Sequence, residues 1–487
     1  MAYIRTYRRG ESTYVQLVFK DGRRISRIIH LGTAHTQIEL DMLLDQAKSL
    51  QISPNQQNLF PVVSQKPDAE LARTTSKLLY DLIRKNYDAL GFAELQDEIF
   101  QHLVIARIVE PVSKLDSIRV LEELGISISK GQVYRSLVKI QKHNYRQSIA
   151  SLCRKYRNIG DHSILLYDVT TLYFETMLED GKRIPGLSKE RRPEPQIVIG
   201  LLVDQTGFPL SLQMFAGNTA ETKTIIPVLN GFKEEYKIEH VTVVADAAML
   251  NQGNIRDITE HGFHYIIGSR QHKMPFAIED YLKTHTNPVD LDIMEQVIDK
   301  NNLQQRAIYQ YSLKRAKLDL ENIDTQLDKA RKIIAGKRSL KRNKFIRLVL
   351  NAKKLNVQQI EKAKSLAGFK GYITNLSLPA EEIIAHYHRL WHVEASFRMS
   401  KSDLRARPIF HHKEESIEAH LTIVMASMAV AKSMEEKSSM AIRRIVKLLK
   451  PLRTGILISK TSRSTLEIQP QIPEEHTKPI NNLSQGY

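Results

Sequence analysis

The sequence predicts an α/β protein in which a mixed β-sheet with flanking helices is interrupted by a large, basic insertion. Two observations support this class. From residue 162 to residue 270, short apolar stretches of strand length alternate with segments of helical periodicity. The net charge of +17, from 71 Lys and Arg against 54 Asp and Glu, is concentrated in residues 301–370. We therefore expect a sheet domain with a basic insertion that binds a polyanion.

The composition sets the size and the expected cellular context. A chain of 487 residues with 42% hydrophobic side chains is long enough for two or three domains with buried cores. Its single cysteine, Cys153, excludes an internal disulfide framework and a cysteine zinc cluster, and it fits a reducing cytoplasm. The N-terminus lacks the apolar run of a signal peptide, and the weakly polar run 421–431 is too short to span a bilayer. We expect a cytoplasmic protein without a membrane partner.

Residues 1–65 are expected to form an N-terminal β-hairpin module and a linker. The stretches "STYVQLVF" and "RRISRIIHLG" alternate apolar and polar residues, and "KDGR" between them supplies a turn. Residues 50–68 are rich in Gln, Asn and Pro, which is typical of a linker.

Residues 66–158 have helical periodicity and contain a candidate helix-turn-helix. A helix over 113–124 and a second over 130–143 are separated by a short turn that contains Gly125. Ser129 can cap the second helix, which exposes Lys130 and Arg135, side chains suited to DNA contacts. A plain helical hairpin explains the pattern equally well, so both interpretations stay open.

The order of the strands predicts a ribonuclease H-like sheet of five strands. Three strands come first, separated by tight turns that favour an antiparallel meander, and two more follow after helices, which favours parallel pairing. The expected strands are 162–175, 196–204, 207–217, 240–247 and 264–270. With the strand after residue 368 and the helix that begins at Pro379, residues 159–270 plus 370–432 make up the expected catalytic core.

The insertion, residues 271–369, carries the most unusual charge. Residues 301–370 hold 18 Lys and Arg against 5 Asp and Glu, on two expected helices over about 313–335 and 339–365. This density favours a nucleic-acid surface over a solvated helix face. After the core, residues 433–487 are expected to form a C-terminal helix and, beyond residue 465, a loose polar tail.

Two aspartates follow apolar runs in the sheet. Asp168 ends "SILLYD" and Asp246 ends "VTVVAD". In a ribonuclease H-like sheet the first and fourth strands are neighbours, so the two carboxylates should face each other where the strands end. Two anions held this close repel each other, and a pair of Mg²⁺ ions with oxygen ligands would offset the repulsion.

A third carboxylate, Glu394, lies on an expected helix with a cluster of DNA-binding side chain types. Tyr387, Glu394 and Lys401 are spaced by seven residues and Arg398 follows Glu394 by four, so all four share one helix face. Taken singly, each aspartate is more often a turn residue, and the glutamate is more often part of a surface ion pair. Their combination and order favour a metal site. No phosphate-binding loop or dinucleotide motif occurs, so we expect no nucleotide cofactor.

Four stretches carry a resemblance to a known family: "YDVTTLYFE", "QIVIGLLVDQTGFPLSLQMFAGNTAE", "VVADAAM" and "LWHVEASFRMSKSDLRARPIFHHKEESIEAHL". With them the sequence resembles the DDE transposases of bacterial insertion sequences, in the cut-and-paste superfamily with an insertion before the last acid. The family's three acids fall on Asp168, Asp246 and Glu394. Its Tyr-Arg-Glu-Lys signature matches at Tyr387, Glu394 and Lys401, whereas Leu390 stands at the arginine position.

The resemblance implies Mg²⁺-dependent cleavage and strand transfer at the terminal inverted repeats of the element. It implies two Mg²⁺ ions on the three acids, with Mn²⁺ as a possible substitute, and a grip on DNA by Tyr387, Arg398 and Lys401. It also implies that the partners are double-stranded DNA, both the terminal inverted repeats and the target, and that the protein forms a homodimer in the DNA complex. The expected location is the cytoplasm of a bacterium, in association with the nucleoid. Two alternatives remain, namely a DNA-binding protein that has lost catalysis and a related nuclease that cuts without joining.

Overall fold

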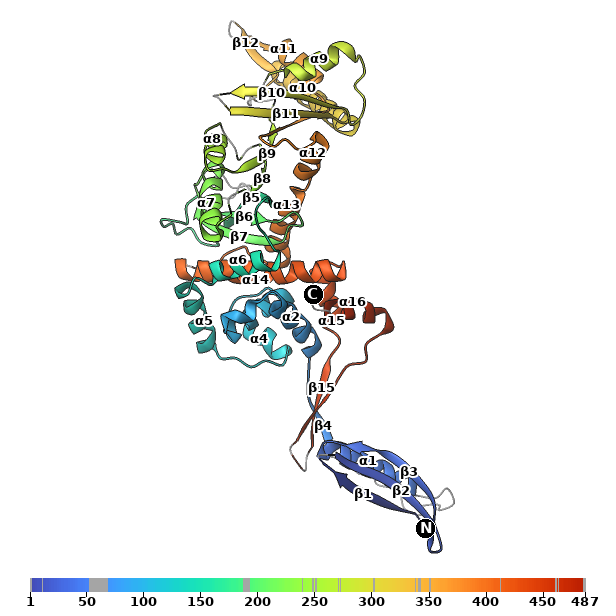
Figure 1. Cartoon of the computed structure of the whole chain (residues 1–487). Coiled ribbons are helices and arrows are strands. Elements are labelled where there is room, and N and C mark those ends of the chain that lie inside the picture. The colour runs from blue at the N-terminus through green and yellow to red at the C-terminus, as the bar shows by residue number, and fades with distance from the viewer. Residues whose placement is uncertain are drawn as a thin grey trace. The chain divides into compact units, whose positions relative to one another are not determined.

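The chain folds into two compact units, each described by itself. One unit comprises residues 1–86, 113–133 and 434–487, and the other comprises residues 87–112 and 134–433. The computed structural model (Figure 1) describes residues 2–10, 12–51, 69–186, 193–238, 240–247, 249, 252–269, 271, 273–300, 303–337, 339, 343–349, 352–411, 413–459, 462 and 464–484. The predicted linker, 50–68, lies almost wholly outside the described residues.

The N-terminal module contains the predicted hairpin and two further elements. Strands β2 (Ser12–Asp21) and β3 (Arg24–Ala34) pair antiparallel around the expected turn, which confirms the hairpin. Within residues 2–10 and 12–51, strand β1 (Ala2–Arg9) extends the sheet to three strands, and helix α1 (Gln37–Gln51) packs against it. Val15 and Leu17, on the face of the sheet that α1 covers, are buried.

The rest of the first unit joins distant parts of the chain. Strand β15 (Thr454–Ser459) pairs antiparallel with both β4 (Ala69–Thr75) and β16 (Thr465–Ile468). The prediction of a loose tail after residue 465 is wrong for the described residues, because β16 is paired and helix α16 (Glu474–Ser484) buries Ile480 and Leu483. The other helices of this unit are α4 (Ser117–Glu123) and α15 (Ile442–Leu449).

Helical elements over residues 77–156 agree with the predicted helical region, 66–158, but the prediction is wrong at its start, where Ala69–Thr75 form strand β4. Val133, Leu137 and Ile140 form the expected buried stripe of α5, and Ser129 caps this helix by accepting a hydrogen bond from the Gln132 backbone at 3.3 Å. Three helices include residues of both units: α2 (Lys77–Ala89), α5 (Lys130–Lys142) and α14 (Glu414–Ser438). The other helical elements here are η1 (Phe92–Leu95), α3 (Glu98–Val109) and α6 (Tyr145–Tyr156).

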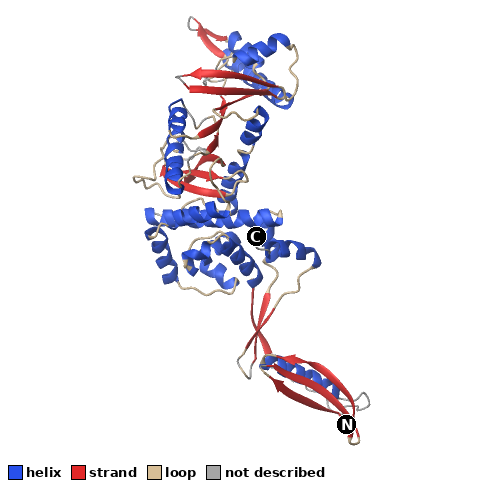
Figure 2. Ribbon diagram, viewed as in Figure 1, coloured by secondary structure: helices blue, strands red, loops and turns tan. Residues whose placement is uncertain are grey.

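The second unit is built on one mixed sheet, drawn in red in Figure 2. Among the described residues its strands follow the order β10-β11-β14-β9-β8-β5-β6-β7. The central strands are β5 (Ile164–Tyr173), β6 (Gln196–Val203), β7 (Pro209–Ala216), β8 (Thr242–Ala245) and β9 (His264–Ser269). Strands β5, β6 and β7 pair antiparallel, whereas β8 pairs parallel with β5 and with β9. This confirms the predicted meander followed by parallel strands.

The sheet is wider than the predicted five strands. In the described part of the chain it has eight, because the insertion adds β10 (Ile293–Lys300) and β11 (Leu303–Tyr311) to its edge. Strand β14 (Phe369–Thr374) pairs antiparallel with β9 and with β11, and so links the insertion to the central strands. Local periodicity marks a strand but does not name its partner, so the extension was not predictable.

Helices cover this sheet. Those outside the basic segment are η2 (Glu221–Lys223), α7 (Ile225–Tyr236), α8 (Gln252–Glu260), α9 (Phe276–Thr284), α12 (Ala380–His388) and α13 (Trp391–Arg398). The predicted buried helix over 421–431 is part of α14, whose residues in this run are all buried. Every helix that the structure describes is too short or too polar to cross a membrane.

The basic segment contains one long helix where two were predicted. Helix α10 (Leu313–Ile334) confirms the first. The second prediction, 339–365, is wrong, because the hairpin of β12 (Ile346–Val349) and β13 (Ala352–Leu355) precedes a short α11 (Val357–Ser365). Phe345 is fully buried against apolar side chains of α10, and its carbonyl accepts a hydrogen bond from the Asn356 backbone at 2.8 Å. These contacts turn the chain back, which helical periodicity cannot predict.

Candidate active site at the centre of the mixed sheet

Asp168 and Asp246 occupy corresponding positions on neighbouring strands. The parallel ladder between β5 and β8 ends with Leu166 opposite Val244, and each aspartate lies two residues further along its strand. Neighbouring strands are about 4.8 Å apart, so this register brings the two backbones to the same level of the sheet. The predicted adjacency of the two acids is therefore supported by the strand pairing.

Asp168 ends the apolar run but lies within its strand, in agreement with the expected strand 162–175. Strand β5 continues to Tyr173, and Asp168 lies within it opposite Leu201 of β6, with a half-buried side chain. The described ladder between β5 and β8 covers Ile164–Leu166 and so ends before Asp168. The carboxylate is thus held on a strand of the sheet just beyond the part that pairs with β8.

Asp246 follows β8 and is exposed. Its Oδ1 accepts one hydrogen bond from the backbone amide of Ala247 at 2.7 Å and another from the Tyr387 hydroxyl at 3.2 Å. Tyr387 comes from α12, which packs against β8, β9 and β14. Burial, and then the charge of Asp246, raises the pKa of the Tyr387 hydroxyl well above its usual range, so this group stays a hydrogen-bond donor. The structure therefore joins the signature tyrosine to the second acid.

Glu394 lies on α13, which packs against β5 and β6, the strands around Asp168. Its side chain is exposed. The predicted continuous helix is wrong, because a turn at Arg389 and Leu390 separates α12 from α13, and a π-helical turn (Met399–Asp403) follows. The seven-residue spacing therefore does not place Lys401 on a regular α-helical face with Glu394.

The remaining predicted DNA-binding residues lie on three different elements. Arg398 is exposed at the end of α13, and Lys401 is half-buried in the π-helical turn. Lys130 and Arg135 are exposed on α5, whose residues belong to both compact units, so they remain a separate prediction. Leu390, at the signature's arginine position, is buried and packs in the core.

Sequence reasoning missed Lys370 on β14. Its ammonium lies 4.5 Å from the centre of the Tyr387 ring and 5.6 Å from that of Tyr372, and the two rings meet edge to face at 5.0 Å. Burial, and then the charge of Arg315, lowers the pKa of Lys370, while Asp246 and Glu394 oppose the shift. Lys370 therefore lies within the electrostatic reach of two of the acids. The alternation in "GFKGYITNL" could have placed it beside Tyr372, but not beside the acids.

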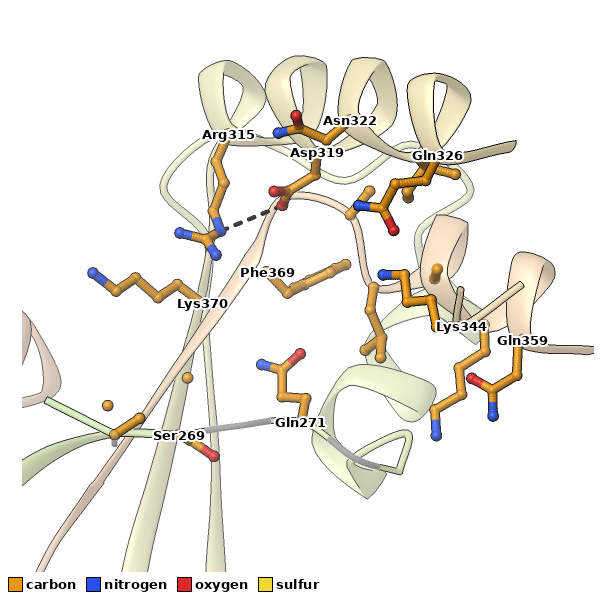
Figure 3. A pocket seen from close by; sticks show the side chains of 18 of the residues that line it. Ser269, Gln271, Arg315, Asp319, Asn322, Gln326, Lys344, Gln359, Phe369 and Lys370 are labelled. Atoms are coloured by element: carbon orange, nitrogen blue, oxygen red, sulfur yellow. Dashed lines mark ion pairs between the residues drawn. The ribbon is translucent and has the colours of Figure 1, made fainter. Parts of the chain in front are cut away.

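A cavity of about 770 Å³ connects this region to the basic insertion (Figure 3). Asp246, Tyr387 and Lys370 line it together with residues of α10, α11 and β9. Figure 3 shows side chains of α10 pointing into it, among them Arg315, which pairs with Asp319 at 3.4 Å. The other lining cations are Lys344 and Lys362. The cavity thus presents four cations and several amides beside one candidate catalytic acid.

The chemistry of the three acids suits a hard divalent cation, which prefers carboxylate oxygens. Within the described residues, however, no three His, Cys, Asp or Glu side chains are gathered closely enough to form a metal site. The strand register and the helix packing bring their elements together without closing a coordination sphere.

Comparison with known proteins identifies the family. The model of the transposase DDE domain matches residues 159–429, which is more than half of the chain. The protein therefore belongs to the DDE transposase family, and the resemblance inferred from its motifs is confirmed at this level.

One similar solved structure is titled as the cryo-EM structure of a piggyBac transposase synaptic complex with hairpin DNA. It is 10% identical in sequence, and the match covers 77% of this chain and 78% of that chain with a TM-score of 0.40. The comparison with curated proteins found no match.

Proposed function

We propose that this protein is a metal-dependent DNA transposase that cleaves and joins DNA at the terminal inverted repeats of its own bacterial insertion sequence. The register that sets Asp168 and Asp246 at the same level of neighbouring parallel strands is the observation that carries the proposal. Glu394 is brought toward them by the packing of α13 on β5. The family match covers all three acids.

The proposed fold of the core is ribonuclease H-like. The five central strands run in the order β7-β6-β5-β8-β9, with an antiparallel meander followed by two parallel strands. We assign the core to residues 159–270 plus 370–432 and the insertion to 271–369. The N-terminal module and linker (1–65), the helical region (66–158) and the C-terminal part (433–487) complete the proposed division.

Asp168, Asp246 and Glu394 are proposed to hold two Mg²⁺ ions, or Mn²⁺ in their place. Bound ions of this kind supply an activated hydroxyl nucleophile and stabilise the charge on the leaving oxygen of a phosphodiester. Tyr387 orients Asp246 through its hydroxyl, and its own ring contacts the Lys370 ammonium and the Tyr372 ring. The positions of these groups on strands and packed helices favour a preorganised site.

The DNA is proposed to approach through the basic cavity and the exposed face of α13. Arg398 and Lys401 would bind phosphates next to the scissile bond, and the cations of the insertion would hold the flanking duplex. Lys130 and Arg135 are proposed to contact the repeat itself if α4 and α5 form a helix-turn-helix. Because two transposon ends must be joined in one complex, we propose a homodimer on DNA, associated with the nucleoid in the cytoplasm.

A cleavage and joining assay tests the proposal. The substrate is a duplex that carries the inverted repeat found beside the gene, with and without Mg²⁺. Asp168→Asn, Asp246→Asn and Glu394→Gln should each abolish cleavage while retaining DNA binding. Glu381→Gln, an exposed acid at the start of α12, is the matched control and should cleave like the wild type.

The outcomes also separate the alternatives. Binding without cleavage by the wild type would indicate a DNA-binding protein that has lost catalysis. Cleavage without any joined product would indicate a nuclease. Near-normal cleavage by any of the three acid variants would show that this acid is not needed for catalysis.

A further inference from the structure

We propose that the sheet of the N-terminal module is a second DNA-binding site, and that its open face enters the major groove of duplex DNA. By open face we mean the side of the β1–β2–β3 sheet opposite to α1. Its principal side chains are Arg5, Arg9, Lys20, Tyr7, Tyr14 and His30. The family match begins at residue 159, so it assigns no role to this module.

One face of the sheet is closed by α1. Figure 1 shows this helix lying along the three strands. A Cβ atom built on Gly32 would lie 2.9 Å from Leu43 of α1, so helix and sheet are in close contact there. The strand register places Val15 and Leu17 on the same face as Gly32, and both are fully buried. The core of the module is therefore complete on this side.

The opposite face carries aromatic rings across all three strands, around Val18 of the central strand, which is buried. The register sets Tyr7 of β1 opposite Tyr14 of β2. Their rings stack at 5.1 Å with an interplanar angle of 8°, and the Tyr14 ring lies 5.9 Å from that of His30 on β3. Tyr7 keeps 41% of its surface exposed although it lies in a paired strand. Some DNA-binding proteins place the strands of a sheet in a groove of the duplex, and tyrosine side chains there can bond to phosphates.

Cations lie beside these rings. The Arg5 guanidinium is 5.9 Å from the centre of the Tyr7 ring, and the Lys20 ammonium is 5.1 Å from that of Tyr3. Arg9 lies two residues beyond Tyr7 on β1, on the same face, because side chains alternate along a strand. None of the described residues that the register assigns to this face is an Asp or Glu. The open face is thus positive as well as aromatic.

The charge of the module is divided between its two sides. The register places three of the six strand cations, Arg5, Arg9 and Lys20, on the open face without an acid. The other three share the helix-side face with Asp21, and α1 adds three acids and one Lys on that side. An acidic partner protein or a membrane would be attracted by charge alone. A row of rings set among arginines matches a ligand with both phosphates and bases, and this favours DNA.

The dimensions suit the major groove. Two adjacent strands about 4.8 Å apart, such as β1 and β2, match the two-stranded ribbon that a major groove about 12 Å wide admits. Arg5 and Arg9 are separated by about 14 Å along the edge strand β1, so each can reach a different phosphate on one groove wall. Exposed Ile28, on the same face, offers an apolar contact of the kind that thymine methyl groups make.

A pair of double variants of the full-length protein tests the proposal. Arg5→Ala with Arg9→Ala removes two charges from the open face. Arg8→Ala with Arg27→Ala removes two charges from the opposite, helix-side face and is the matched control. The probes are a labelled DNA duplex of about three helical turns and the corresponding single strand. Binding is measured by fluorescence anisotropy over a range of KCl concentrations, after thermal melting has shown that all variants fold.

We expect the open-face variant to lower duplex affinity about 10- to 60-fold near 0.1 M salt and to reduce the salt slope by about 1.8, the value for two phosphate contacts. The control variant should keep the wild-type slope. An equal loss in both variants would show that only total charge matters and would overturn the proposal, as would unchanged binding. If the open-face variant loses affinity only for the single strand, the ligand of this face is single-stranded DNA, and the proposal of a duplex is wrong.

The choice of DNA as the polyanion rests on the proposed function, but the two can fail separately. If the open-face variant binds and cleaves like the wild type, only this inference is wrong. If the wild type does not cleave and the open-face variant still loses binding, only the transposase activity is wrong.

Discussion

Replacing Tyr387 by phenylalanine isolates one hydrogen bond at the candidate site. The change removes the hydroxyl that donates to Asp246 Oδ1 at 3.2 Å but keeps the ring that packs against Tyr372 and Lys370. A hydrogen bond to a charged group contributes about 1.5–3 kcal/mol, and the lower end applies because Asp246 is exposed. A loss of about 1.4 kcal/mol corresponds to a tenfold lower rate.

The assay is cleavage of the repeat duplex over a range of Mg²⁺ concentrations. We expect Tyr387→Phe to cleave about tenfold more slowly at low Mg²⁺ and to recover partly as Mg²⁺ rises, because the variant loses orientation of a metal ligand. Tyr372→Phe is the matched control, since its hydroxyl bonds to His388 Nε2 at 3.1 Å and not to an acid. Wild-type rates for Tyr387→Phe at every Mg²⁺ concentration, or an equal loss in the control, would refute the reasoning.

Three further predictions concern charge, packing and pH. Replacing three cavity cations, Arg315, Lys344 and Lys362, by glutamine should lower the salt slope of DNA binding by about 2–3. The control is the same triple change at Lys317, Lys329 and Lys364, which do not line the cavity and should leave the slope less affected. Phe345→Ala should destabilise the insertion by about 3–5 kcal/mol, seen as earlier unfolding in urea, because the ring is fully buried. Burial lowers the pKa of His386 from its usual 6.5, so the unfolded chain binds more protons and stability falls as the pH drops below about 6.5. In His386→Leu the urea midpoint should change less between pH 7.5 and 5.5.

The sheet illustrates how far local patterns reach. The apolar run of β6 and the turn residues after it predict a meander, and the helices after residue 219 predict parallel strands, because both follow from neighbouring residues. The pairing of β14 with both β9 and β11 joins residues about 100 and 65 positions apart. Such pairing is decided by which edges remain open after collapse, and no periodicity records it.

The candidate site shows the same division. The types and order of Asp168, Asp246 and Glu394 are visible in the sequence because metal and phosphate chemistry needs few kinds of side chain. Lys370 was not visible, because a lysine on a strand is ordinary until its neighbours are known. The break of the expected helix at Leu390 was also hidden, because Leu390 fits a helical apolar stripe as well as the turn it occupies.

By itself the sequence determined the α/β class, the alternation of elements around the core, the basic insertion and the DDE transposase family, and it supplied three acids as candidates for the site. These depend on residue type, spacing and charge, which are properties of the chain. Only the tertiary structure decided that the insertion widens the sheet, that Tyr387 bonds to Asp246, and that Lys370 lies among the rings beside the acids. These depend on distances between residues far apart in the chain, which are set when the elements pack against one another.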